Sequence, residues 1–210
     1  MIIISHRGYW KTVTEKNTRV AFERSFSLGF GTETDLRDHN SKLVISHDMP
    51  GLNAMPLEEF FDIYKEIGNN LPLALNIKSD GLQEELRRHL LSFDVRNYFV
   101  FDMAVPDGLA YAKKEFNTYT RQSEFEALPA YYELANGVWL DEFLGHWITD
   151  KIVEDHLHQG KALCIVSPEL HKHDNANAWQ HYHQLEKKIG FNRLMLCTDY
   201  PEQAMEYFNA

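Results

Sequence analysis

The sequence IIISHRG at residues 2–8 is the clearest indication of the fold, because a short and continuously apolar run ends in histidine, arginine and glycine. A run that is apolar at every position is typical of a strand covered on both faces in a parallel sheet. Two further runs also carry charged residues at their ends. GTETDL at 31–36 contains two carboxylates, and LVIS at 43–46 is followed by His47 and Asp48. We therefore expect polar side chains from three chain segments to gather at one end of a sheet.

The rest of the chain alternates short apolar runs with longer helix-like runs. Strands are predicted at 2–5, 31–36, 43–46, 73–77, 98–103, 118–121, 137–141, 161–166 and 193–197. Helices are predicted at 17–28, 57–67, 81–91, 107–115, 124–134, 149–159, 176–189 and 201–208. Segment 57–67 has the clearest pattern, since its apolar residues recur at the spacing that places them on one helix face.

Eight strand–helix units predict an α/β protein, namely a TIM-type (β/α)₈ barrel formed as a single domain by residues 1–210. An open doubly wound sheet is the competing arrangement. No glycine-rich phosphate fingerprint follows the first strand, and the count of eight units favours a closed barrel.

Composition narrows the possible partners and compartment. A net charge of −10 without a lysine or arginine stripe argues against nucleic acid or an anionic membrane as partner. No apolar run approaches the ~18 residues that span a bilayer. The first residues do not have the form of a signal peptide, so we expect a cytoplasmic protein. Cys164 and Cys197 lie in apolar runs and are predicted to be buried, reduced thiols. The oligomeric state is left open.

Polar residues fall at or just after the predicted strand ends, where barrels of this type carry their active groups. They are His6, Glu33, Asp35, Asn76, Lys78, Asp102, Arg121, Asp141 and Asp199. Glu33 and Asp35 are two residues apart on a strand, so their side chains share a face and repel each other unless a cation lies between them. Ca²⁺ and Mg²⁺ prefer such oxygen ligands. The alternative is a solvent-facing strand edge.

Eight of the histidines fall into two predicted groups. His6 and His47 follow strands, and two imidazoles on opposite sides of a phosphodiester can act as its general acid and general base. Arg7 and Lys78 are suited to bind phosphate oxygens, or else to form ion pairs with the two carboxylates. Six more histidines in helix-like or loop segments are predicted to be solvated surface residues: His156, His158, His171, His173, His181 and His183.

Four ordered motifs together resemble the glycerophosphodiester phosphodiesterase family of the PLC-like phosphodiesterase superfamily. They are HRG at 6–8, NTxxAF at 17–22, GxExD at 31–35 and LVxxHD at 43–48. NIK at 76–78 and TDxP at 198–201 fall where that family has its middle and last strand motifs. The match is dense through residue 48 and sparse from about residue 100 to 190.

The resemblance implies an enzyme, a phosphoric diester hydrolase that cleaves a small or lipid-derived phosphodiester with the help of a divalent metal, Ca²⁺ or Mg²⁺. It implies that His6 and His47 are the acid and base. The implied metal ligands are Glu33, Asp35 and Asn76, and the implied phosphate-binding residues are Arg7 and Lys78. In the family a neighbouring substrate hydroxyl attacks phosphorus first, giving a cyclic phosphate that water opens. Further residues are expected around the pocket: Asp48, Asp102, Arg121, Trp139 and Asp141.

Three departures from the family pattern keep alternatives open. Asn76 stands where a third carboxylate is usual, with Asp102 or Asp141 as possible substitutes, and Lys16 stands where a glutamate is expected, although Glu15 is adjacent. The chain is also a short variant without the usual insertion after His47. The alternatives are PLC-like release of a cyclic phosphate, a barrel that binds phosphate ligands without catalysis, and an aldolase-type lyase with Lys78 as a Schiff-base amine.

Overall fold

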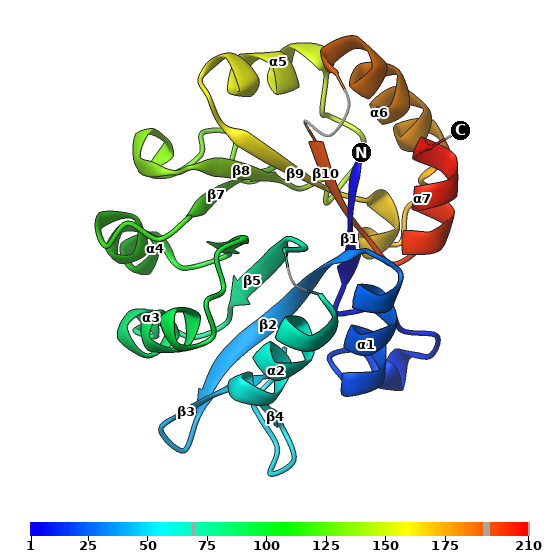
Figure 1. Cartoon of the computed structure of the whole chain (residues 1–210). Helices are drawn as coiled ribbons and strands as arrows, with labels where there is room; N and C mark the ends of the chain where they lie inside the picture. Colours follow the sequence, from blue (N-terminus) through cyan, green and yellow to red (C-terminus); the bar gives the residue numbers. More distant parts are fainter. Residues whose placement is uncertain (69, 191–193, 210) are drawn as a thin grey trace.

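The computed structural model describes residues 1–68, 70–190 and 194–209, and it contains eight parallel strands closed into a barrel with helices outside (Figure 1). The barrel strands are β1 (Ile2–His6), β2 (Gly31–His39), β5 (Leu73–Ile77), β6 (Tyr98–Phe101), β7 (Tyr119–Gln122), β8 (Gly137–Leu140), β9 (Ala162–Val166) and β10 (Leu194–Thr198). β1 pairs with both β2 and β10, and a parallel bridge between Val100 and Thr118 joins β6 to the segment leading into β7. The predicted (β/α)₈ barrel is therefore confirmed. The start of the predicted strand at 193 lies outside the described residues.

Helices follow most of the barrel strands. They are α1 (Arg19–Ser27), α2 (Leu57–Ile67), α3 (Gln83–Ser92), α4 (Val105–Lys113), α5 (Asp150–His158), α6 (Ala176–Ile189) and α7 (Pro201–Phe208). The predicted bounds of α2, α6 and α7 are confirmed, and the others shift by a few residues. α5 begins after Thr149, whose hydroxyl accepts the backbone N–H of Ile152 at 3.4 Å as a helix cap.

The helix predicted at 124–134 is wrong. The segment forms a bridge between Ser123 and Glu126 and then a single 3₁₀ turn at Tyr132–Leu134. Pro129 lies in the middle of the segment and cannot donate the hydrogen bond that a continuing helix requires. The Glu124 carboxylate instead accepts the backbone N–H groups of residues 143–145, which ties this loop to the loop after β8.

The run at 43–46 is not a barrel strand. β2 continues past the barrel, and the chain returns antiparallel to it as β3 (Lys42–Ile45), which pairs with β4 (Met55–Pro56) (Figure 1). At the end of this return the Ser46 backbone N–H donates to the Asp35 carbonyl at 3.0 Å. His47 therefore reaches the barrel mouth because a hairpin folds back onto it.

The barrel interior is filled by apolar side chains from alternate strand positions. It includes Ile4, Ala74, Phe99, Phe101, Tyr119, Trp139, Cys164, Val166 and Cys197. The aromatic rings stack within it, Phe99 on Tyr119 and Phe101 on Trp139, each with ring centroids 3.9 Å apart. Two larger apolar clusters lie between the strands and the surrounding helices. The interior gives the mouth an apolar floor.

The two thiols are buried and free, as predicted, and burial raises the pKa of both Cys164 and Cys197. His156, predicted to be a surface residue, is buried instead. It lies on the same face of α5 as Val153, and its two ring nitrogens bond the Tyr132 hydroxyl and Gln122 at 2.8 Å each. A histidine three residues from a core valine shares its helix face, which explains why the prediction was wrong.

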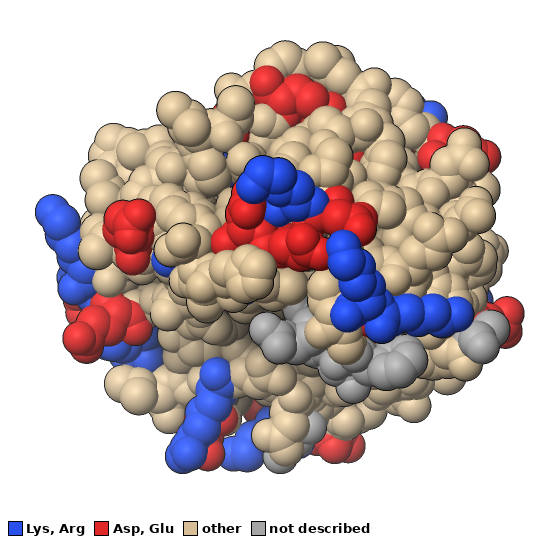
Figure 2. All heavy atoms as spheres, turned by 90° about the horizontal axis from the view of Figure 1, so that it is seen from above, with Lys and Arg blue, Asp and Glu red and all other residues tan. Residues whose placement is uncertain are grey.

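The charged side chains of the described residues are distributed in small groups over the face that Figure 2 shows. On the face seen in Figure 2, Lys and Arg side chains of the described chain lie in separate groups beside Asp and Glu rather than in a continuous stripe. None of the helices within the described residues has both the length and the apolar character needed to cross a membrane.

Gly8 is required at the turn that leaves β1. Its φ is +77°, and a Cβ there would stand 2.9 Å from the Ala21 backbone carbon. Gly8→Ala is therefore expected to lower the free energy of unfolding by about 2–3 kcal/mol, measured by urea denaturation. Gly29→Ala is the matched control, because Gly29 has φ +79° and open space around it. Equal losses in the two variants would contradict the close approach.

Candidate active site

A ring of polar side chains lies one layer above the apolar barrel interior. Side chains two residues apart on a strand share a face, so the residue two positions after an interior side chain also points inward, at the mouth. The pairs are Ile4 and His6, Ala74 and Asn76, Tyr119 and Arg121, Trp139 and Asp141, and Cys197 and Asp199. Of the polar members of these pairs, all except Asp199 line a cavity of about 270 Å³. Of the predicted site residues, all except Asp35 and Asp48 line this cavity.

His6 forms a carboxylate–imidazole pair at the mouth. Its Nδ1 lies 2.7 Å from Asp199 Oδ1, and both side chains are largely buried. An ionised carboxylate only accepts hydrogen bonds, so Nδ1 carries the proton and donates it to Asp199. The Nε2 atom is then free to accept or donate a proton. The structure thus gives His6 a fixed tautomer.

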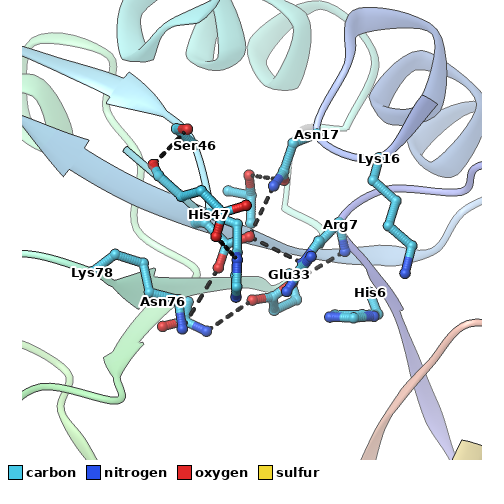
Figure 3. Close-up of polar contacts among 12 residues, drawn as sticks. His6, Arg7, Lys16, Asn17, Glu33, Ser46, His47, Asn76 and Lys78 are labelled. Atoms are coloured by element: carbon cyan, nitrogen blue, oxygen red, sulfur yellow. Dashed lines mark hydrogen bonds and ion pairs between the residues drawn. The ribbon is translucent and has the colours of Figure 1, made fainter. Parts of the chain in front are cut away.

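His47 forms a second, more exposed pair. Its Nδ1 lies 2.9 Å from Asp48 Oδ1, and the histidine is 41% exposed while the aspartate is 91% exposed. His47 lines the cavity, but Asp48 lies in a larger neighbouring cavity that His47 also lines. The two predicted imidazoles therefore meet at one cavity, as Figure 3 shows, with Glu33 and Asn76 beside them.

Glu33 and Asp35 project from β2 to the inside of the barrel, where both are buried. Glu33 accepts the Arg7 backbone N–H at 3.0 Å and the Asn76 amide N–H at 3.2 Å. Burial and, to a lesser extent, the like charge of Asp35 together raise the pKa of Glu33 to about 7. The alternative of a solvent-facing strand edge is wrong for both residues.

Two oxygens at this place lack a hydrogen-bond partner among the described residues. They are Asp35 Oδ1 and Asn76 Oδ1, both buried. The two residues face each other on β2 and β5. A buried oxygen without a hydrogen bond is costly, and a cation would satisfy both atoms. The donor set consists of oxygens, which suits Ca²⁺ or Mg²⁺.

The proposed set of metal ligands needs the side-chain amide oxygen of Asn76. Among the described residues, no group of three or more His, Cys, Asp or Glu side chains is placed to hold a metal. A site at the β2–β5 edge would therefore consist of Glu33, Asp35 and the neutral Asn76.

Arg7 lies over the acidic pair. Its backbone is in the left-handed region, with φ +58°, and its Nε is 3.1 Å from Asp35 Oδ2. Asn17, also at φ +58°, donates its amide to the same Asp35 oxygen at 2.8 Å and accepts the Thr34 hydroxyl at 2.9 Å. Two residues in a sparsely populated backbone conformation thus position groups on one carboxylate, which is typical of functional sites.

Lys78 and Arg121 share one carboxylate on the other side of the cavity. Lys78 Nζ is 2.8 Å from Asp102 Oδ2, and Arg121 Nη1 is 2.6 Å from Asp102 Oδ1. Asp102 has φ +70°, immediately after β6. Lys78 is also 3.8 Å from Asp35 Oδ1. Asp102 is therefore already paired with two cations, so it is poorly placed to replace a carboxylate at Asn76.

Sequence reasoning missed His171. Predicted to be a surface residue, it lines the cavity, and its Nε2 lies 2.6 Å from Asp141 Oδ1. That hydrogen bond raises the pKa of His171. The residue follows β9 in a 3₁₀ turn at Pro168–His171, so its position after a strand end was the available signal. The Asp141 carboxylate is therefore already hydrogen-bonded to His171.

The unusual Lys16 lies beside the first imidazole pair. Its Nζ is 3.9 Å from Asp199 Oδ2 and 4.4 Å from the Trp10 ring centroid. Glu15 does not replace the missing glutamate near Arg7, because its carboxylate binds Arg24 at 2.8 Å. The lysine therefore adds a positive charge next to the carboxylate that orients His6.

The raised pKa of Glu33 predicts a pH dependence of stability for the metal-free protein. The native pKa of about 7 exceeds the ordinary value of 4.5, so the native state binds more protons between these values. Stability is therefore expected to fall as pH rises from about 4.5 to about 7. Urea denaturation in chelator across this range measures it, and Glu33→Gln is expected to flatten the slope. An unchanged slope in that variant would contradict the assignment.

Comparisons with known proteins find similarity in structure. No family sequence model matches the chain, and no curated protein matches it. A protein from Galdieria sulphuraria assigned as a glycerophosphodiester phosphodiesterase superposes with a TM-score of 0.79 at 19% identity, covering 100% of this chain and 98% of that chain. A phosphodiesterase from Oleispira antarctica, solved with the product sn-glycerol-3-phosphate, gives 0.70 at 15% identity, covering 100% and 97%.

A Ca²⁺-dependent phosphatidylinositol-specific phospholipase C from Streptomyces antibioticus is more distant, with a TM-score of 0.57 at 11% identity over 99% of this chain and 95% of that chain. Sequence identities this low show that the folds are similar and nothing more. The chain has the barrel fold shared by glycerophosphodiester phosphodiesterases and a PLC-like phosphodiesterase.

Proposed function

We propose that the protein is a phosphoric diester hydrolase that uses a divalent metal to cleave a small or lipid-derived phosphodiester of the glycerophosphodiester type. One observation carries the proposal. Two imidazoles, each with its Nδ1 on a carboxylate, line a single cavity above a buried carboxylate pair. The similar folds of phosphodiesterases support the same reaction class.

In this proposal the two histidines move protons on opposite sides of phosphorus. One imidazole Nε2 takes the proton of the attacking hydroxyl as a new P–O bond forms, and the other gives a proton to the alkoxide as the old P–O bond breaks. We assign His6 as the acid and His47 as the base, because the largely buried Asp199 holds the His6 imidazole in place. The reverse assignment uses the same atoms and protons.

The cations and the acidic pair have separate tasks. Arg7 and Lys78 bind the nonbridging phosphate oxygens, releasing part of their contacts with Asp35 and Asp102. Glu33, Asp35 and Asn76 would hold Ca²⁺ or Mg²⁺. When bound, the metal supplies positive charge that stabilises the developing charge on phosphorus.

The test is release of alcohol from glycerophosphodiesters with Ca²⁺ or Mg²⁺ present, and its loss with chelator. Product analysis, cyclic against open phosphate, decides between the hydrolase and PLC-like release of a cyclic product. Absence of turnover on a panel of diesters, with the wild-type fold intact, would contradict the proposal.

A binding module without catalysis is the second candidate, because Asn76 and Lys16 both weaken the catalytic arrangement. Asn76 removes one charge from the metal ligands, and Lys16 places a cation 3.9 Å from the carboxylate that orients His6. Calorimetry separates the two functions: a binding module takes up a phosphodiester independently of metal and leaves it intact.

A further inference from the structure

A second, larger cavity adjoins the candidate active site. It has a volume of about 840 Å³, against about 270 Å³ for the site cavity, and the two share Arg7 and His47 in their linings. We refer to it as the outer cavity. It lies between the loop before α1 and the segment connecting β3 to β4, where the chain returns from the hairpin to the mouth.

Because Arg7 and His47 line both cavities, their position determines which part of a substrate each cavity binds. A diester phosphorus bound by Arg7 next to His47 lies where the cavities meet, so its two ester arms must point in different directions. A volume near 270 Å³ accommodates a small alcohol. A volume near 840 Å³ lies in the range that binds ligands of drug-like size. The geometry therefore favours a substrate with unequal arms.

The lining of the outer cavity mixes polar and apolar side chains. The polar ones include Lys16, Asn17 and Ser46 together with the ion pair of Arg19 and Glu59, and the apolar ones include Val13, Leu52 and Met55. Val13 and Leu52 form part of the apolar wall and are 72% and 95% exposed. The outer cavity thus offers cationic side chains suited to a phosphate and apolar side chains suited to a hydrocarbon chain.

The surface around the mouth has the same character. Among the described residues, the large apolar side chains more than two-thirds exposed, apart from Leu91, all lie on loops or in a short 3₁₀ turn after strands at this end: Val13, Met49, Leu52, Phe125, Leu128 and Leu144. Phe125 contacts Phe143 of the site cavity, with ring centroids 5.7 Å apart. Exposed apolar groups gathered at one site mark a binding surface.

We propose that the outer cavity binds the apolar arm of an amphiphilic phosphodiester that carries a single acyl or alkyl chain, while the site cavity takes the small alcohol. This inference rests on the proposed function, since it assumes that phosphate binds at Arg7 and His47. It adds the substrate class that the site itself leaves open.

The test compares two diesters with the same headgroup, glycerophosphocholine and a short-chain lysophosphatidylcholine kept below its critical micelle concentration. We expect kcat/KM for the lysolipid to be at least about tenfold higher, because apolar contact adds binding energy. Leu52→Asp is expected to lower the lysolipid-to-glycerophosphocholine ratio of kcat/KM by about tenfold. Leu91→Asp is the matched control on the outer surface of α3 and should leave the ratio unchanged.

The outcomes separate the inference from the proposed function. Turnover of glycerophosphocholine without preference for the lysolipid, or an unchanged ratio in Leu52→Asp, overturns the inference and leaves the hydrolase proposal intact. No turnover of either diester overturns the proposed function. A preference seen solely with phosphatidylcholine vesicles, and not with monomeric lysolipid, overturns the cavity assignment in favour of contact with a lipid surface.

Discussion

Replacing His6 with glutamine is expected to lower kcat/KM by about 10³-fold, because the glutamine amide cannot transfer a proton at neutral pH. The imidazole is held by Asp199 at 2.7 Å and lines the cavity in which the phosphate is expected. The change leaves the apolar barrel interior untouched, so the fold should persist. Steady-state kinetics on a glycerophosphodiester, with circular dichroism as the check of folding, measure the effect.

The neighbouring residues provide the controls for this prediction. Asp199→Asn keeps the shape of the side chain but removes the carboxylate that holds the His6 imidazole, so a smaller loss, about 10- to 100-fold, is expected. His158→Gln, at the exposed end of α5, should behave as wild type. Wild-type activity in His6→Gln would show that His6 is neither the acid nor the base.

Glu33→Gln is expected to abolish the response to divalent metal and to lower kcat/KM by about 10²- to 10³-fold. Glu33 is one of two charged ligands proposed for the metal, and the neutral Asn76 cannot compensate for its loss. For the wild type, Ca²⁺ or Mg²⁺ at 100 times its dissociation constant should stabilise the fold by about 2.7 kcal/mol. Thermal unfolding with and without metal measures this difference.

Asp107→Asn is the matched control for the metal prediction. Asp107 is also a buried carboxylate, it accepts the Gly81 backbone N–H and the Gln83 amide, and it does not line the site cavity. This variant should keep both the metal response and the activity. Metal stabilisation of Glu33→Gln equal to that of wild type would show that the cation binds elsewhere.

Local patterns predicted most of the fold, for reasons visible in particular elements. α2 places Leu57, Phe60, Phe61 and Tyr64 on one buried face, and its sequence has that period. β5 is buried throughout and reads as a continuous apolar run apart from Asn76. The predictions that were wrong concern segments whose structure depends on contacts with distant parts of the chain. The segment 124–134 contains apolar residues at helical spacing, but Pro129 and the role of Glu124 in holding the next loop prevent a helix.

The candidate site was predictable where strand position sets direction, and less so where a loop or a distant partner does. Glu33 and Asp35 share a face because strands alternate, which the sequence predicts directly. The pairing of His6 with Asp199 joins residues 193 positions apart and depends on β1 lying beside β10. His171 reaches the cavity through a 3₁₀ turn, which has no repeating pattern to detect.

The most direct test is a crystal structure of the protein with Mn²⁺ and sn-glycerol-3-phosphate, using the anomalous signal to locate the metal. We expect a peak bound by oxygens of Glu33, Asp35 and Asn76, with the phosphate contacting Arg7 and Lys78 between the two imidazoles. A phosphate bound outside this mouth, or a metal peak away from the carboxylate pair, would contradict this expectation.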